Sequence, residues 1–233
     1  TARTTPEPYD LFELFRKMAD AGCKYVIMEV SSQGLEQKRV SPCQFKVGVF
    51  TNLTQDHLDV HGTMENYYQA KKILFLQSDS AIINIDDKYS DMFMIEGNNN
   101  ITFGINNGDL GIYDIKMTNL GIDFKFRYEN KNYETNIDMV GKYNVYNYIM
   151  ALMIIHSFGF SIEDIINLND IKAPRGRMEM VKYRTNSIFV DYAHKPDAVK
   201  KVLDCTREFC VGKIITIIGC GGNRDKTKRP IMG

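Results

Sequence analysis

The chain has 233 residues, 44% of them hydrophobic, and its 29 Lys and Arg residues balance 29 Asp and Glu residues. It therefore lacks the basic excess with which nucleic-acid-binding proteins neutralise phosphates, and we expect no nucleic acid partner. The longest apolar run, Ile149 to Ile155, is far short of the ~20 residues that a membrane-spanning helix needs, so we expect no membrane partner. The five scattered cysteines and the absence of a signal-peptide pattern predict a cytoplasmic protein.

The first part of the chain alternates predicted helices with short predicted strands. Apolar residues at helical spacing predict a helix over Leu11–Ala21, and the apolar run Tyr25–Val30 is the first predicted strand. Further strands are predicted at Val47–Thr51 and Ala81–Ile85, on either side of a helix over Met64–Gln77. This alternation predicts an α/β fold with a mostly parallel sheet and covering helices.

The pattern changes in the middle of the chain. Polar and apolar residues alternate from Gly111 to Val140, with turn residues between the runs, which predicts an antiparallel β insertion. A helix is predicted from about Val145 to Phe158, and Ser161 with Asp164 resembles the capping box that begins another.

The segment Ala173–Gly176 is the best candidate for a linker between domains. After it, a strand (Ser187–Val190), a helix (Asp197–Phe209) and a strand (Ile214–Ile218) predict the start of a Rossmann-like α/β domain. We therefore expect one domain over residues 1–175 and the beginning of a second over 176–233. The chain does not begin with Met and stops soon after a Gly-rich loop, so we also expect a fragment of a longer protein.

Polar residues follow the first two predicted strands, at the sheet edge where ligands of open α/β folds bind. Glu29, Ser31 and Ser32 end the first strand, although alone they also fit a strand end with a capping serine. The loop after the second strand holds Asp56, His57, Asp59 and His61, a set too polar for a core. Leu58 replaces the glutamate of a zinc-protease motif. Glu29 with His57 suits a hard cation such as Mg²⁺, which leaves room for phosphates.

Other candidate clusters are weak when taken singly. Lys71 alone is typical of a solvated helix lysine. The strand-end loop that begins at Gly219 carries Arg224 and Lys226 and predicts an anion-binding loop. No Walker A motif occurs in the chain. The remaining clusters are Asn144–Asn147, Gly176–Glu179 and Asp191–His194.

Together and in this order, these stretches resemble the Mur ligases, specifically the MurE type. The most specific are His57–Glu65 and the Gly-rich loop that begins at Gly219. The resemblance implies a Mur ligase central domain followed by the start of its C-terminal domain. It also implies ATP-dependent addition of L-lysine or meso-diaminopimelate to UDP-N-acetylmuramoyl-L-alanyl-D-glutamate in peptidoglycan synthesis, through an acyl phosphate.

The resemblance also implies roles for individual residues. Glu29 and His57 would hold Mg²⁺, and Lys71 would be carbamylated by CO₂ and support a second metal ion. The residues implied for ATP binding are Asn144, Asn147, Arg177, Asp191, Arg224 and Lys226. The residues implied for binding the UDP-muramoyl dipeptide are Thr4, Thr5, Ser31, Gln37 and Arg39.

Several features limit the resemblance and leave alternatives open. Arg3 stands where Asn is usual, and Lys195 where Thr is usual. The P-loop and the motif that selects the amino acid are absent from the sequence, so we expect this chain alone to be inactive, and the choice between lysine and diaminopimelate stays open. The alternatives are another amide ligase of the superfamily, such as a folylpolyglutamate or cyanophycin synthetase, and a non-catalytic nucleotide- or muramoyl-binding module.

Overall fold

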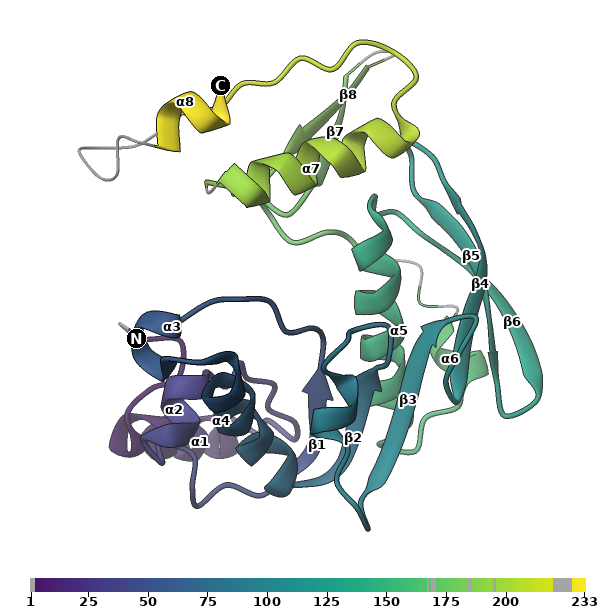
Figure 1. Cartoon of the computed structure of the whole chain (residues 1–233). Coiled ribbons are helices and arrows are strands. Elements are labelled where there is room, and N and C mark those ends of the chain that lie inside the picture. The colour runs from purple at the N-terminus through teal and green to yellow at the C-terminus, as the bar shows by residue number, and fades with distance from the viewer. Residues whose placement is uncertain (1–2, 167, 169–170, 184–185, 195, 220–227) are drawn as a thin grey trace. The chain divides into compact units, whose positions relative to one another are not determined.

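A computed structural model describes residues 3–166, 168, 171–183, 186–194, 196–219 and 228–233 (Figure 1). The chain divides into two compact units, residues 1–104 and 105–233. Within the described residues, no helix combines the length and the apolar character needed to cross a membrane.

The first unit contains parallel strands in chain order: β1 (Phe45–Phe50), β2 (Ser78–Asn84) and β3 (Asn99–Ile105). The middle strand β2 is buried along almost its whole length. A strand with neighbours on both sides and cover on both faces needs such an apolar run. The parallel sheet predicted from the sequence is confirmed, but β3 was missed because it begins in an asparagine-rich stretch.

Helices α1 (Pro8–Asp20), α2 (Ser32–Glu36) and α4 (Met64–Leu76) gather beside β1 (Figure 1). Leu11 of α1 and Leu35 of α2 form one buried cluster with Val40. Tyr67 and Phe75 of α4 join a second cluster with Phe50 of β1. The short helices α3 (Leu58–His61) and η1 (Ser90–Phe93) complete the unit. The helices predicted near α1 and α4 are therefore confirmed.

The predicted strand Tyr25–Val30 is wrong. The segment forms no strand among the described residues, and its side chains Tyr25, Val26 and Ile27 are 58%, 46% and 86% exposed. Within this segment, Met28 and Val30 are the residues that pack against the cluster formed by Leu11, Leu35 and Val40. An apolar run becomes a strand only where its backbone groups pair with a neighbouring strand, and the periodicity of one segment does not reveal that neighbour.

The second unit begins with antiparallel strands β4 (Leu110–Met117), β5 (Ile122–Tyr128) and β6 (Lys131–Ile137). Glu129 and Asn130, between β5 and β6, have φ angles of 48° and 62°, as the tight turn of a hairpin requires. The predicted antiparallel insertion is confirmed.

Two helices follow these strands. Helix α5 (Lys142–His156) packs on β5, with the rings of Phe124 and Tyr148 5.7 Å apart. Helix α6 (Ile162–Ile166) begins at the predicted cap, because Ser161 Oγ accepts a hydrogen bond from the Asp164 backbone N–H at 3.1 Å.

The last part of the unit has an antiparallel pair, β7 (Glu179–Tyr183) and β8 (Asn186–Val190), followed by α7 (Pro196–Phe209) and α8 (Lys228–Met232). Phe189 of β8 contacts Phe209 of α7, with ring centroids 5.5 Å apart. The predictions for β8 and α7 are confirmed. The predicted strand Ile214–Ile218 is wrong: the segment is not a strand, and its apolar residues are largely exposed, Ile217 at 95%.

Candidate functional site

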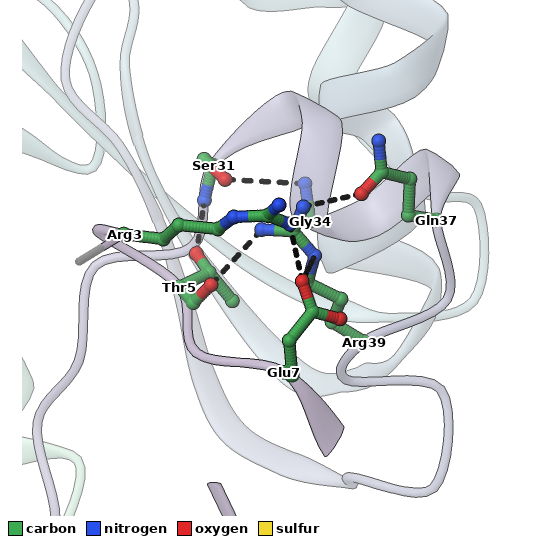
Figure 2. Close-up of polar contacts among 7 residues, drawn as sticks. All are labelled: Arg3, Thr5, Glu7, Ser31, Gly34, Gln37 and Arg39. Atoms are coloured by element: carbon green, nitrogen blue, oxygen red, sulfur yellow. Dashed lines mark hydrogen bonds and ion pairs between the residues drawn. The ribbon is translucent and has the colours of Figure 1, made fainter. Parts of the chain in front are cut away.

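Thr5 organises a polar cluster in the first unit, which we call the Arg39 cluster (Figure 2). Its members are Arg3, Thr5, Glu7, Ser31, Gly34, Gln37 and Arg39. The hydroxyl of the fully buried Thr5 accepts a hydrogen bond from the Ser31 backbone N–H at 2.9 Å and donates to the Glu29 carbonyl at 3.3 Å. Ser31 in turn caps helix α2, since its Oγ accepts from the Gly34 N–H at 3.1 Å.

Arg39 is 4% exposed, so its charge needs partners. Its Nη1 donates to the Thr5 carbonyl at 3.0 Å, its Nη2 donates to Gln37 Oε1, and its Nε lies 3.4 Å from Glu7 Oε1. Glu7 also pairs with Arg3. Sequence reasoning missed Glu7, which precedes α1 at its N-cap position and carried no signal for this ion pair.

The structure therefore brings together four of the five residues predicted to bind the UDP-muramoyl dipeptide: Thr5, Ser31, Gln37 and Arg39. Thr4 is exposed. Gly34 makes the close packing possible, because a Cβ at this position would lie 2.9 Å from Thr5 Cγ2. A buried guanidinium beside hydroxyl groups can bind phosphate or carboxylate oxygens.

His57 stands in a strained backbone position at the start of α3. Its φ of 53° and ψ of 25° lie in the left-handed region, which is uncommon for a residue with a side chain. The Asp56 carboxylate accepts a hydrogen bond from the His57 backbone N–H at 2.9 Å, and the His57 side chain is half-exposed.

His61 corrects the expectation that this loop is too polar for a core. Its side chain is fully buried, with Nε2 2.9 Å from Ser32 Oγ and Nδ1 3.2 Å from Glu36 Oε1. The ring stacks on Tyr67 with centroids 5.1 Å apart. Hydrogen bonds at both nitrogens offset the desolvation of the imidazole, so a histidine can pack inside.

Lys71 is not the solvated helix lysine that its sequence context alone indicates. Its Nζ lies 5.2 Å from the centroid of the Tyr67 ring. Burial lowers the pKa of Lys71 below its usual value, and Glu29 and Asp56 oppose that shift. The two carboxylates therefore lie within electrostatic reach of the amine. We call His57, His61, Tyr67 and Lys71 the Tyr67 cluster.

The carboxylates of Glu29 and Asp56, which lie within electrostatic reach of Lys71, are oxygen donors of the kind that Mg²⁺ accepts. No group of three or more His, Cys, Asp or Glu side chains in the described part of the chain is arranged to hold a metal. Mg²⁺ commonly takes one or two protein carboxylates and fills its other positions with water and phosphate oxygens. Glu29 can supply such a carboxylate.

In the second unit, the predicted residues Asn144 and Asn147 lie in the first turns of α5. The buried Asn144 donates from Nδ2 to the Val140 carbonyl at 2.8 Å, and its Oδ1 accepts from Asn147 Nδ2 at 3.2 Å. The pair thus fixes the start of the helix, and Asn147 remains exposed.

Asp191, at the end of β8, holds the turn at residues 176–178, which we call the Asp191 turn. Its Oδ2 accepts from the Met178 N–H at 2.9 Å, and its Oδ1 accepts from the Ala193 N–H at 2.8 Å. Met178 has a φ of 49°, so this hydrogen bond supports a strained residue. Arg177 is exposed within the turn.

Sequence reasoning missed Tyr143, which lies among these residues. Burial raises the pKa of Tyr143, Cys205 and Asp191 raise it further, and Arg177 opposes the shift. Tyr143, in the first turn of α5, therefore lies within electrostatic reach of Arg177 and Asp191. Arg224 and Lys226, predicted to bind ATP, lie outside the described residues, as does Lys195.

The chain has an α/β fold, and its clusters of polar side chains lie near the ends of strands and the starts of helices. The family model of the Mur ligase middle domain matches residues 1–155, and that of the Mur ligase, glutamate ligase domain, matches residues 176–233. The chain belongs to the Mur ligase family.

Two curated relatives are similar along almost the whole chain. One is UDP-N-acetylmuramoyl-L-alanyl-D-glutamate--2,6-diaminopimelate ligase 1 of Clostridium acetobutylicum, 47% identical over 99% of this chain and 49% of that protein. The ligase of Fusobacterium nucleatum with the same activity in its name is 45% identical, over 98% of this chain and 48% of that protein. The chain thus spans about half the length of the curated relatives it matches.

A solved structure supports the same relationship. A structure of UDP-N-acetylmuramoyl-L-alanyl-D-glutamate--2,6-diaminopimelate ligase superposes with a TM-score of 0.82 and 31% identity, over 98% of this chain and 49% of that one. The α/β fold class predicted from the sequence and the predicted family are therefore confirmed.

Proposed function

We propose that the chain is part of an ATP-dependent ligase that adds meso-diaminopimelate to UDP-N-acetylmuramoyl-L-alanyl-D-glutamate in peptidoglycan synthesis. The observation that carries this proposal is the 47% identity, across 99% of the chain, to a relative named for that substrate and that amino acid. The relatives' names favour diaminopimelate over L-lysine, which the sequence alone left open. Residues 1–175 would form the central domain and residues 176–233 the start of the C-terminal domain, in keeping with the two family matches.

The Arg39 cluster would bind the anionic UDP-muramoyl dipeptide. The buried Arg39 and Thr5 would hold the segment in place and supply a positive charge beneath it, and the half-buried Ser31 would offer its hydroxyl group to the ligand. Side chains locked before binding lose little entropy when the ligand arrives. The exposed Thr4 and Gln37 would contact the ligand from the rim.

Glu29, His57 and Lys71, the last as a carbamate, would hold Mg²⁺ at the reacting phosphate. The bound metal ions would neutralise charge between the two anions that must meet when the substrate carboxylate attacks the γ-phosphorus of ATP. Burial of Lys71 favours its neutral amine, and only the neutral amine can take up CO₂.

The second unit would bind ATP. Asn144 and Asn147 would face the adenine, and Arg177 and Asp191 would engage the rest of the nucleotide, with Arg224 and Lys226 as further candidates. The support is that Arg177 and Asp191 lie within electrostatic reach of Tyr143 in the first turn of α5. The acyl phosphate formed with ATP would then react with the amine of diaminopimelate. We place the enzyme in the cytoplasm, because the four described cysteines are free thiols.

The test measures phosphate release by the full-length gene product that contains this chain. The assay contains ATP, Mg²⁺ and UDP-N-acetylmuramoyl-L-alanyl-D-glutamate, with meso-diaminopimelate in one series and L-lysine in another. Release that depends on meso-diaminopimelate is the expected result. Release only with L-lysine would correct the amino acid. No release with either, from folded protein, would contradict the proposal and favour another amide ligase or a binding module.

A further inference from the structure

Tyr67 contacts three side chains: those of His57, His61 and Lys71. Its ring stacks on His61 at 5.1 Å with an interplanar angle of 24°, and it meets the ring of His57 edge-on at 6.2 Å. The Lys71 amine lies 5.2 Å from its centroid. Tyr67 is 6% exposed, and all four residues belong to the first unit.

The residue on which the Tyr67 ring stacks, His61, is fixed by hydrogen bonds. Hydrogen bonds to Ser32 and Glu36 fix both nitrogens of the buried His61 ring against which Tyr67 stacks. The carbonyl of His61 also accepts from Asn66 Nδ2 at 2.9 Å, which ties α3 to the first turn of α4. The ring therefore has little freedom to move away from Lys71.

We propose that Tyr67 is a positioning residue, whose ring holds the Lys71 amine in the place where its carbamate forms. This inference rests on the proposed function, in which Lys71 carries that group. In the reaction, the Nζ lone pair forms a bond to the carbon of dissolved CO₂, one C=O electron pair moves onto oxygen, and the nitrogen releases a proton to water. The ring face excludes water from one side of the amine, which favours its neutral form, and limits where the long Lys71 side chain can point.

The experiment follows the carbamate directly, without substrates. The full-length gene product is equilibrated with ¹³C-labelled bicarbonate, and the carbamate resonance is assigned to Lys71 by its loss in Lys71→Ala. The variant Tyr67→Leu removes the ring, whereas Tyr67→Phe keeps it. The matched control is Tyr68→Leu, since Tyr68 is the next residue of α4 and its hydroxyl bonds to Glu65 instead.

We expect Tyr67→Leu to need at least about fivefold more dissolved CO₂ for half-occupancy, because the Lys71 side chain would regain rotamers that point its amine away from the site. Tyr67→Phe and Tyr68→Leu should stay within about twofold of the wild type, as expected when that contact is kept. In the ligase assay, kcat of Tyr67→Leu should fall and recover with added bicarbonate, while its KM for ATP stays unchanged. This split would not arise from a general loss of folded protein.

A Tyr67→Leu variant that takes up CO₂ like the wild type would overturn the inference, as would a wild type with no carbamate resonance from Lys71. If Tyr67→Leu does not fold, Tyr67→Met replaces it, since methionine fills the space without a ring. A readout on the wild type needs no ring substitution: the ε-methylene protons of Lys71 should lie upfield of those of other lysines, and a random-coil position contradicts the contact. Missing phosphate release would contradict the proposed function but leave these measurements readable.

Discussion

The Tyr67 cluster and the Asp191 turn both hold polar groups in fixed positions, but they do so through different kinds of contact. In the Tyr67 cluster, side chains hold other side chains: an aromatic ring lies against His57, His61 and Lys71. In the Asp191 turn, one carboxylate holds the backbone, through the N–H groups of Met178 and Ala193.

The difference sets what a substitution can damage. Packing around a ring is spread over many weak contacts, so a substitution that keeps the ring should keep the arrangement. A carboxylate that accepts two backbone N–H groups has no such tolerance, because an isosteric amide replaces one acceptor with a donor. A substitution that keeps the ring, such as Tyr67→Phe, should therefore be mild. Asp191→Asn, which keeps the size and shape of the side chain, should be damaging.

The largest effect is expected from Lys71→Ala in the full-length gene product. The carbamate support for the metal would be lost, and ligase turnover should fall by about 100-fold or more. Added formate or acetate should restore part of it by standing in for the carbamate oxygens. The matched control is the neighbouring lysine, Lys72→Ala, which should keep most of the activity. Full activity in untreated Lys71→Ala would remove Lys71 from the site.

The next effect is expected from Asp191→Asn. The amide must turn its NH₂ group toward one of two backbone donors, so a charge-assisted hydrogen bond worth about 1.5–3 kcal/mol is lost. We expect a lower midpoint of thermal unfolding and a KM for ATP raised about tenfold, because Arg177 lies in the turn. Glu179→Gln is the matched control: Glu179 accepts from the Gly176 N–H, which a glutamine oxygen can still do. If Asp191→Asn and Glu179→Gln changed the midpoint of unfolding and the KM for ATP equally, the claim that Asp191 needs both of its carboxylate oxygens would be wrong.

A third, smaller effect tests the Arg39 cluster. The added methyl group of Gly34→Ala would meet Thr5 Cγ2 at 2.9 Å and Ser31 Oγ at 3.1 Å. Overpacking of this kind costs about 1–3 kcal/mol of unfolding free energy, measurable by urea titration. Thr5→Ser should relieve part of the cost, since it removes Cγ2. Gly212→Ala, where the Cβ has open space, should change the stability by less than about 0.5 kcal/mol. No destabilisation by Gly34→Ala would show that the cluster is loosely packed.

The sequence predicted correctly the elements whose signal is local, and it was wrong where a strand depends on a distant partner. The helix near α4 and the hairpin at Asn130 follow from spacing and turn residues. The apolar runs Tyr25–Val30 and Ile214–Ile218 were wrong as strands, since pairing is not written in a single run. In the site, the resemblance named Lys71, but the burial of His61 and the position of Tyr67 appear only when α3 and α4 fold together.

The smallest expected effect is a change in the reactivity of Cys205, which packs with Val140 and Met178 under the Asp191 turn. Burial raises the pKa of Cys205 to about 11, with Glu208 and Asp191 adding to the shift. At pH 8 iodoacetamide should therefore label it much more slowly than the exposed Cys23, since the thiolate is the reactive form. Peptide mass spectrometry over time measures both rates.

Asp191→Asn removes a negative charge near the Cys205 thiol and loosens the turn above it, so labelling of Cys205 should quicken by about threefold, a change that corresponds to about half a pKa unit. Tyr67→Leu, which alters the other region, should leave that rate unchanged, and Cys23 serves as the internal reference in both variants. If Tyr67→Leu quickened the labelling of Cys205 as much as Asp191→Asn does, the two regions would not be held by independent contacts. If neither variant did, the carboxylate would not be what keeps the turn closed over the thiol.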